Sequence, residues 1–116
     1  MIKIYHNPRC KKSREALDFL EKKGHKVQII RYLEDKITVN DLSTLLKKIN
    51  LSAMEIVRKN ESVWKKKYSK MKLNEEELTE ILSENPKLIE RPIVEFKNSG
   101  VLARPLDHLI NFLKKK

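Results

Sequence analysis

The stretch that decides the fold is IKIYHNPRCKKSREALDFLEKKGHKVQII, residues 2–30. It opens with a short β-prone run at 2–5 and turns at an Asn-Pro pair. A helical pattern then runs over 10–23 and stops at two lysines and a glycine, which is a common helix ending. A second β-prone run follows at 27–30. Strand, helix and strand within about 30 residues predict a βαβ unit with parallel strands and a right-handed crossover.

The rest of the chain changes character twice. Between about 38 and 90, three capping signatures, each a Ser, Thr or Asn followed three residues later by an acid, precede helical runs. Residues 92–96 and 101–103 then flank a short loop and predict a β-hairpin, after which Pro105 suits the first turn of a last helix. We therefore expect one α/β domain over 1–116: a mixed four-stranded sheet with a helical insertion between a βαβ half and a ββα half.

Composition excludes several classes of protein. The chain has 116 residues, with 26 Lys or Arg against 16 Asp or Glu, giving a formal net charge of +10. That balance favours anionic partners. No run approaches the roughly 20 apolar residues of a membrane span, and the first residues lack the apolar core of a signal peptide. We expect a cytoplasmic protein without membrane contact. A single cysteine allows no internal disulfide, and we expect no metal site and no bound cofactor.

The single cysteine lies in HNPRCKKSR, residues 6–14, where the first strand gives way to the first helix. Cys10 should meet unpaired helix N–H groups and the positive end of the helix dipole, which favour the nucleophilic thiolate. His6 could turn back and add positive charge, and the Ser13 hydroxyl could donate a hydrogen bond to the sulfur. Singly, His6 is more often structural and Ser13 more often a helix-start residue. Their combination under dense positive charge favours a reactive Cys10. Because no second cysteine exists, any reductant must come from outside the chain.

Three arginines lie beside turns and prolines, not on lysine-like helix faces. Arg58 falls at the expected end of a helix, while Arg91 and Arg104 each precede a proline. In a mixed sheet, the loop after the first strand and the loop before a proline-led strand can be neighbours, which would bring Arg91 and Arg104 toward Cys10. The planar guanidinium fork suits a tetrahedral oxyanion. Taken singly, each arginine fits an ordinary surface ion pair better, for example with Glu90 or Glu61.

In order and spacing, these motifs resemble the glutaredoxin-linked arsenate reductase family, part of the wider ArsC and Spx group. The segments that carry the resemblance are 4–10 with 13–14, 32–33, 57–61, 91–94 and 103–105. The resemblance spans nearly the whole chain. It implies a thioredoxin-like fold with a helical insertion.

The resemblance also implies an activity and roles for particular residues. Cys10 would attack the arsenic of arsenate, His6 and Ser13 would lower the pKa of its thiol, and Pro92 would follow a cis peptide bond. The residues that it assigns to binding arsenate and the arsenite adduct are Arg58, Arg91 and Arg104. Glutathione would be the co-substrate and glutaredoxin the protein partner that completes the reduction to arsenite.

Other readings stay open beside this one. An Spx-like regulator that binds RNA polymerase is disfavoured, because Ser13 replaces the second cysteine of the usual redox switch. A thiol oxidoreductase acting on an unknown substrate fits the same residues. A nucleic-acid-binding module rests on charge alone, since aromatic residues make up 6% of the chain without a stacking motif. Arsenate reduction is the function that the sequence favours.

Overall fold

A computed structural model describes residues 2–115. It divides the chain into two compact units. The first, here called the sheet unit, takes both ends of the chain, up to Asp35 and from Arg91 onward. The second, here called the helical unit, is Lys36–Glu90, where the sequence predicted an insertion at about 38–90. That the whole chain is a single domain stays a prediction.

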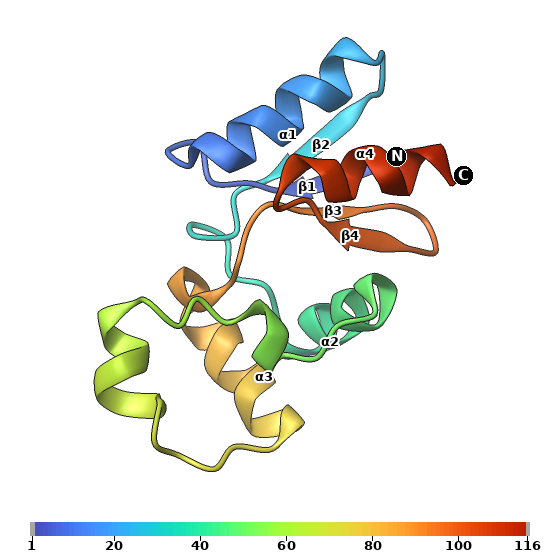
Figure 1. The fold of residues 1–116 in the computed structure, drawn as a ribbon. Helices are drawn as coiled ribbons and strands as arrows, with labels where there is room; N and C mark the ends of the chain where they lie inside the picture. The colour runs from blue at the N-terminus through green and yellow to red at the C-terminus, as the bar shows by residue number, and fades with distance from the viewer. Residues whose placement is uncertain (1, 116) are drawn as a thin grey trace. The chain divides into compact units, whose positions relative to one another are not determined.

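The sheet unit contains the mixed four-stranded sheet that the sequence predicted, with strand order β2-β1-β3-β4. Its strands are β1 (Ile2–Tyr5), β2 (Val27–Ile30), β3 (Ile93–Glu95) and β4 (Gly100–Leu102). β1 pairs parallel to β2 and antiparallel to β3, and β3 pairs antiparallel to β4. Both the predicted βαβ unit and the predicted hairpin are therefore confirmed (Figure 1). The strand order places the C-terminal end of β1 beside the start of β3.

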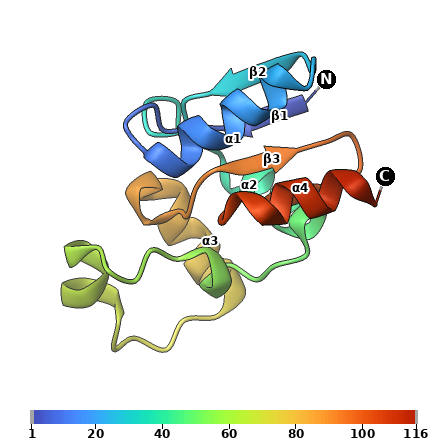
Figure 2. The same cartoon turned by 45° about the horizontal axis from the view of Figure 1, so that its top comes forward.

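Two helices lie side by side on one face of this sheet: α1 (Lys11–Lys22) and α4 (Leu106–Lys114) (Figure 2). The helical spacing of Ala16 and Leu20 places both side chains on the buried side of α1. They pack against Ile4 and Val94 of the sheet and Leu109 of α4, and all five are fully buried. This core fixes where α1 begins relative to the ends of β1 and β3.

The ends of α1 follow local chemistry. Cys10 is the N-cap, with extended backbone angles of φ −93° and ψ 121°. After Lys22 the chain leaves the helix through Gly24, whose φ of +84° is readily adopted only by glycine. At the other end of the sheet unit, Pro105 is the N-cap of α4, one position before the first turn that the sequence predicted. The peptide bonds Arg91–Pro92 and Arg104–Pro105 are both cis.

The helical unit contains α2 (Val39–Ile49) and α3 (Glu75–Glu84). Its shorter turns are η1 (Met54–Ile56), η2 (Trp64–Tyr68) and η3 (Pro86–Leu88). The capping signature at Ser52 and Glu55 starts only the single turn η1, not a longer helix. A bridge between Val57 and Ile89 ties the segment after η1 to the segment after η3. Among residues 2–115, every helix is too short or too polar to cross a bilayer.

A capping box closes the start of α3, and its removal should be measurable. The Asn74 side chain accepts a hydrogen bond from the Glu77 N–H at 2.8 Å, and the Glu77 carboxylate accepts one from the Asn74 N–H at 3.0 Å. We expect Asn74→Ala to lower the free energy of unfolding by about 1 kcal/mol, because it leaves a helix N–H without its partner. Urea denaturation followed by circular dichroism measures the change. The control Asn40→Ala, at an exposed position of α2, should show no such loss.

Candidate active site

The loop from β1 to α1 is shaped by Asn7. The His6 N–H donates to the Ile30 carbonyl at 2.9 Å, so the chain stays attached to β2 one residue beyond β1. The Asn7 carbonyl then accepts from the Cys10 N–H at 3.0 Å, and Asn7 Oδ1 accepts from the Arg9 N–H at 3.0 Å. These two hydrogen bonds close a tight turn. The turn places Cys10 at the N-terminal tip of α1.

Ser13 of α1 contacts the same loop through its side chain. Its side chain is fully buried, and its Oγ accepts a hydrogen bond from the Asn7 N–H at 3.1 Å. The same Oγ lies 2.6 Å from His6 Nδ1. The sequence predicted that the Ser13 hydroxyl could donate a hydrogen bond to the sulfur, but this hydroxyl contacts His6 and Asn7. The Ser13 backbone N–H is the group that hydrogen-bonds to Cys10. Ser13 therefore positions the loop and supplies a backbone donor.

His6 is buried and carries less positive charge than the sequence suggested. Burial lowers the pKa of its imidazole below the ordinary value of 6.5, and the positive charges of Arg31 and Arg14 lower it further. Glu21 opposes them more weakly. With a pKa below 6.5, the ring is mostly neutral at pH 7. The lowered pKa argues against a positive charge on His6 beside the sulfur at neutral pH, and the contact that the structure shows for its ring is the one with Ser13.

The cause of this shift can be tested directly. We expect the imidazole of His6 to titrate at a lower pH than a free histidine, and Arg31→Gln to raise its pKa, because one repelling charge is removed. NMR titration of the ring resonances measures both values. Lys114→Gln, at the last residue of α4, removes the same charge and should leave the His6 titration unchanged. A His6 pKa unaffected by Arg31→Gln would leave burial and the charge of Arg14 as its causes.

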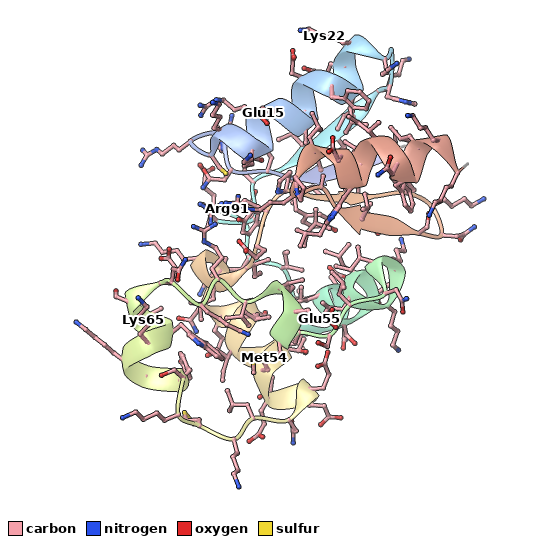
Figure 3. The ribbon with its side chains drawn as sticks, viewed as in Figure 1. Glu15, Lys22, Met54, Glu55, Lys65 and Arg91 are labelled. Atoms are coloured by element: carbon pink, nitrogen blue, oxygen red, sulfur yellow. The ribbon has the colours of Figure 1, made fainter. Side chains whose placement is uncertain are left out.

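Two arginines from the other half of the sheet unit meet the sulfur. Arg104 Nη1 donates to Cys10 Sγ at 3.7 Å and to the Arg91 carbonyl at 3.3 Å. The Arg91 side chain, at the entry to β3, lies close enough to the sulfur for its hydrogen bond and charge to lower the pKa of Cys10. Figure 3 labels Arg91. Its Nε is buried and has no hydrogen-bond partner among the described residues. The structure thus brings Arg91 and Arg104 to Cys10, as the sequence predicted.

These donors decide the acidity of the thiol. Burial alone raises the pKa of Cys10, but the Ser13 N–H, the hydrogen bond and charge of Arg91, and the hydrogen bond from Arg104 outweigh it. The net result is a pKa below the ordinary value for cysteine. More thiolate is then present at neutral pH than in a free thiol, and the thiolate is the form that attacks electrophiles. Cys10 itself is partly exposed.

Arg58 lies in the helical unit and is held by two carboxylates. Its Nη1 is 3.3 Å from Glu90 Oε1, and its Nε is 3.7 Å from Glu61 Oε2. These ion pairs match the alternative that the sequence left open for each arginine. That Arg58 binds an oxyanion stays a prediction.

Sequence reasoning missed the parts played by Asn7 and Arg31. Asn7 was recognised only as a turn residue, although its position before proline and three residues before the cysteine was a usable signal. Arg31 directly follows β2, and the parallel pairing of β1 with β2 places it near His6. Among residues 2–115, no group of three His, Cys, Asp or Glu side chains could hold a metal ion.

Comparison with known proteins places this site in a family. The profile of the ArsC family matches residues 5–111. The chain is 36% identical over 112 residues to an arsenate reductase of Haemophilus influenzae, covering 95% of this chain and 97% of that protein. It is 38% identical over 114 residues to YfgD of Escherichia coli K12, an uncharacterized protein, covering 97% and 96%.

A solved structure agrees over the same length. The arsenate reductase from Vibrio cholerae superposes with a TM-score of 0.89 at 36% identity, covering 95% of each chain. The mixed sheet with its two covering helices is therefore the thioredoxin-like fold of such proteins. From the family profile and these relatives, the chain belongs to the ArsC family.

Proposed function

We propose that this protein is an arsenate reductase in which Cys10 is the nucleophile. The observation that carries the proposal is the acidified sulfur of Cys10 with two guanidinium groups, Arg91 and Arg104, donating to it. An arsenate oxygen that replaced the thiolate as acceptor would find planar, charged donors already in place. Relatives that are 34% and 36% identical are named for this reaction.

The first chemical step forms a bond between sulfur and arsenic. The Cys10 thiolate attacks arsenic(V), and one arsenate hydroxyl group takes up a proton and leaves as water. Arg91 and Arg104 stabilise the negative charge that the remaining oxygens carry, which is how fixed donors lower the barrier of such displacements. His6 and Ser13 act as positioning residues, because their contacts keep Cys10 at the tip of α1.

The reduction itself requires two electrons from outside thiols. Glutathione displaces a second oxygen from arsenic as water. A glutaredoxin thiolate then attacks the glutathione sulfur. The bond between that glutathione sulfur and arsenic breaks, and its electron pair stays on arsenic. Arsenic(V) becomes arsenic(III), while two thiols become one mixed disulfide. Water finally displaces Cys10 from arsenic(III), releasing arsenite and the thiolate. This route suits a chain with one cysteine in the cytoplasm, where thiols are kept reduced.

A reconstituted assay tests this function. The full chain is mixed with arsenate, glutathione and a glutaredoxin, and arsenite is measured directly while glutathione reductase reports the oxidation of glutathione. We expect arsenite only when all three components are present. Folded protein whose Cys10 alkylates readily but which forms no arsenite would reject arsenate as the substrate. Arsenite formed without glutaredoxin would reject the proposed reductant.

A further inference from the structure

Three exposed cations flank Cys10 in the sequence, and none has an ion-pair partner among the described residues. Arg9 precedes the cysteine, and Lys11 and Lys12 form the first turn of α1 directly after it. All three side chains are exposed, and among residues 2–115 none of them forms an ion pair. We call these three residues the basic rim.

The positive charges of the basic rim are unfavourable at the start of α1. Helix N-termini carry partial positive charge and favour acidic side chains, yet the first turn of α1 contains no acid. The other α-helices follow the rule, with Asp41 in the first turn of α2, Glu75 in that of α3 and Asp107 in that of α4. The rim is also not among the main groups that acidify Cys10, which are the Ser13 N–H, Arg91 and Arg104. Its charges thus serve neither the helix nor, in the main, the thiolate.

We propose that the basic rim is a docking surface for an acidic thiol protein, whose own reactive thiol is surrounded by Asp and Glu side chains. This proposal rests on the proposed function, in which Cys10 depends on a thiol from another molecule. The small oxyanion has its donors in Arg91 and Arg104, so the exposed rim remains for a larger partner. Complementary charge would steer that partner to the sulfur and raise the association rate.

The charge pattern favours a protein over a nucleic acid. Phosphate-backbone binding uses a long stripe of cations, usually with aromatic side chains for stacking, whereas the rim is confined to residues adjacent to Cys10. The thiol exchange with the partner must take place beside that same sulfur, at the disulfide that Cys10 forms. A compact acidic face around a thiol matches the rim in both charge and position.

The test isolates the partner step from arsenate chemistry. Oxidised glutathione first converts Cys10 to a mixed disulfide, releasing one glutathione thiolate. The thiolate of an acidic glutaredoxin then attacks the glutathione sulfur, forms a new disulfide and frees the Cys10 thiolate. Stopped-flow mixing at 20 and 500 mM NaCl (about 20 and 4 Å Debye lengths) gives the rate constant. The same reaction with uncharged 2-mercaptoethanol gives a reference rate constant. The measured quantity is the ratio of the glutaredoxin rate constant to this reference.

The variant is Lys11→Glu with Lys12→Glu, and the matched control is Lys65→Glu with Lys66→Glu in η2, where both lysines are also exposed. We expect the rim variant to lower the ratio about 10-fold or more at low salt, and the difference to close at high salt. The control should stay within about twofold of the unchanged protein, and the thermal midpoint of the rim variant should not fall, since acids suit that helix end.

Three results would overturn the proposal. Equal losses in the rim variant and the control would show an effect of net charge alone. An unchanged ratio would show that the rim does not act on the partner. An equal loss when reduced glutathione replaces the glutaredoxin would assign the rim to a small anion and not to a protein. Since arsenate is absent, each outcome stands whether or not arsenate is the substrate.

Discussion

Cys10→Ser should abolish arsenite formation in the reconstituted assay and leave the fold unchanged. A serine hydroxyl at this position stays protonated at neutral pH and cannot form the sulfur–arsenic bond that carries the arsenic through its reduction. The loss should be complete within the sensitivity of arsenite detection, because the chain has no second cysteine to replace the first. Arsenite quantified by mass spectrometry gives the result.

Stability gives the control for this variant. Cys10 is the N-cap of α1 and its side chain makes no capping hydrogen bond, whereas serine is among the preferred N-cap residues. At a pH below the folded pKa of Cys10, we therefore expect Cys10→Ser to unfold at the same urea concentration as the unchanged protein or a slightly higher one. Arsenate binding, measured by calorimetry, should persist because Arg91 and Arg104 remain. Full activity in a folded Cys10→Ser protein would remove Cys10 from the reaction.

The same pair of proteins should differ in how their stability depends on pH. Because the pKa of Cys10 is lowered in the folded state, the unfolded chain binds more protons at pH values between that pKa and the ordinary one. Stability from this group therefore rises with pH across that interval and is lost as the pH falls through the folded pKa. Cys10→Ser removes this contribution, so the difference between the two stability curves should follow the same interval.

The sequence predicted the fold most closely around α1. Alternating apolar residues, the lysine pair and Gly24 are local features, and they predicted α1 and its neighbouring strands to within a residue or two. Proline placement likewise predicted that Arg91 and Arg104 would approach the sulfur. These inferences succeeded because each depends on chain direction and sheet pairing, which periodicity and turn residues already specify.

The hydrogen-bond partners inside the site could not be read in the same way. Nothing local to Ser13 indicates whether its hydroxyl meets the sulfur or His6, and the answer depends on how the 6–10 loop closes over α1. The neutral state of His6 depends on burial and on Arg31 from the end of β2. Likewise, a capping pair at Ser52 predicted a helix, but the following residues form only the single turn η1. Burial and long-range pairing decided each case.

Arg104→Gln should raise the pKa of Cys10 and lower kcat/KM for arsenate by about 100- to 1,000-fold. The guanidinium donates to the sulfur across 94 positions of sequence, so its loss removes both a thiolate donor and an oxyanion donor. Removing one fixed donor to a developing charge typically costs this much in rate. The pH dependence of alkylation by iodoacetamide gives the thiol pKa, and initial rates of arsenite formation give kcat/KM. Lys97→Gln, at an exposed position between β3 and β4, removes the same charge as a control.

Arg104→Lys separates the two contributions of that guanidinium. Lysine keeps the positive charge but lacks the planar fork that can hold two oxygens at once. We expect the pKa of Cys10 to stay closer to that of the unchanged protein than in Arg104→Gln, while kcat/KM remains strongly reduced. If turnover recovered fully with lysine, charge alone would explain the site. If both variants shifted the pKa without reducing kcat/KM, Arg104 would acidify the thiol and play no part in holding arsenate, leaving Arg91 as the donor from this half of the sheet.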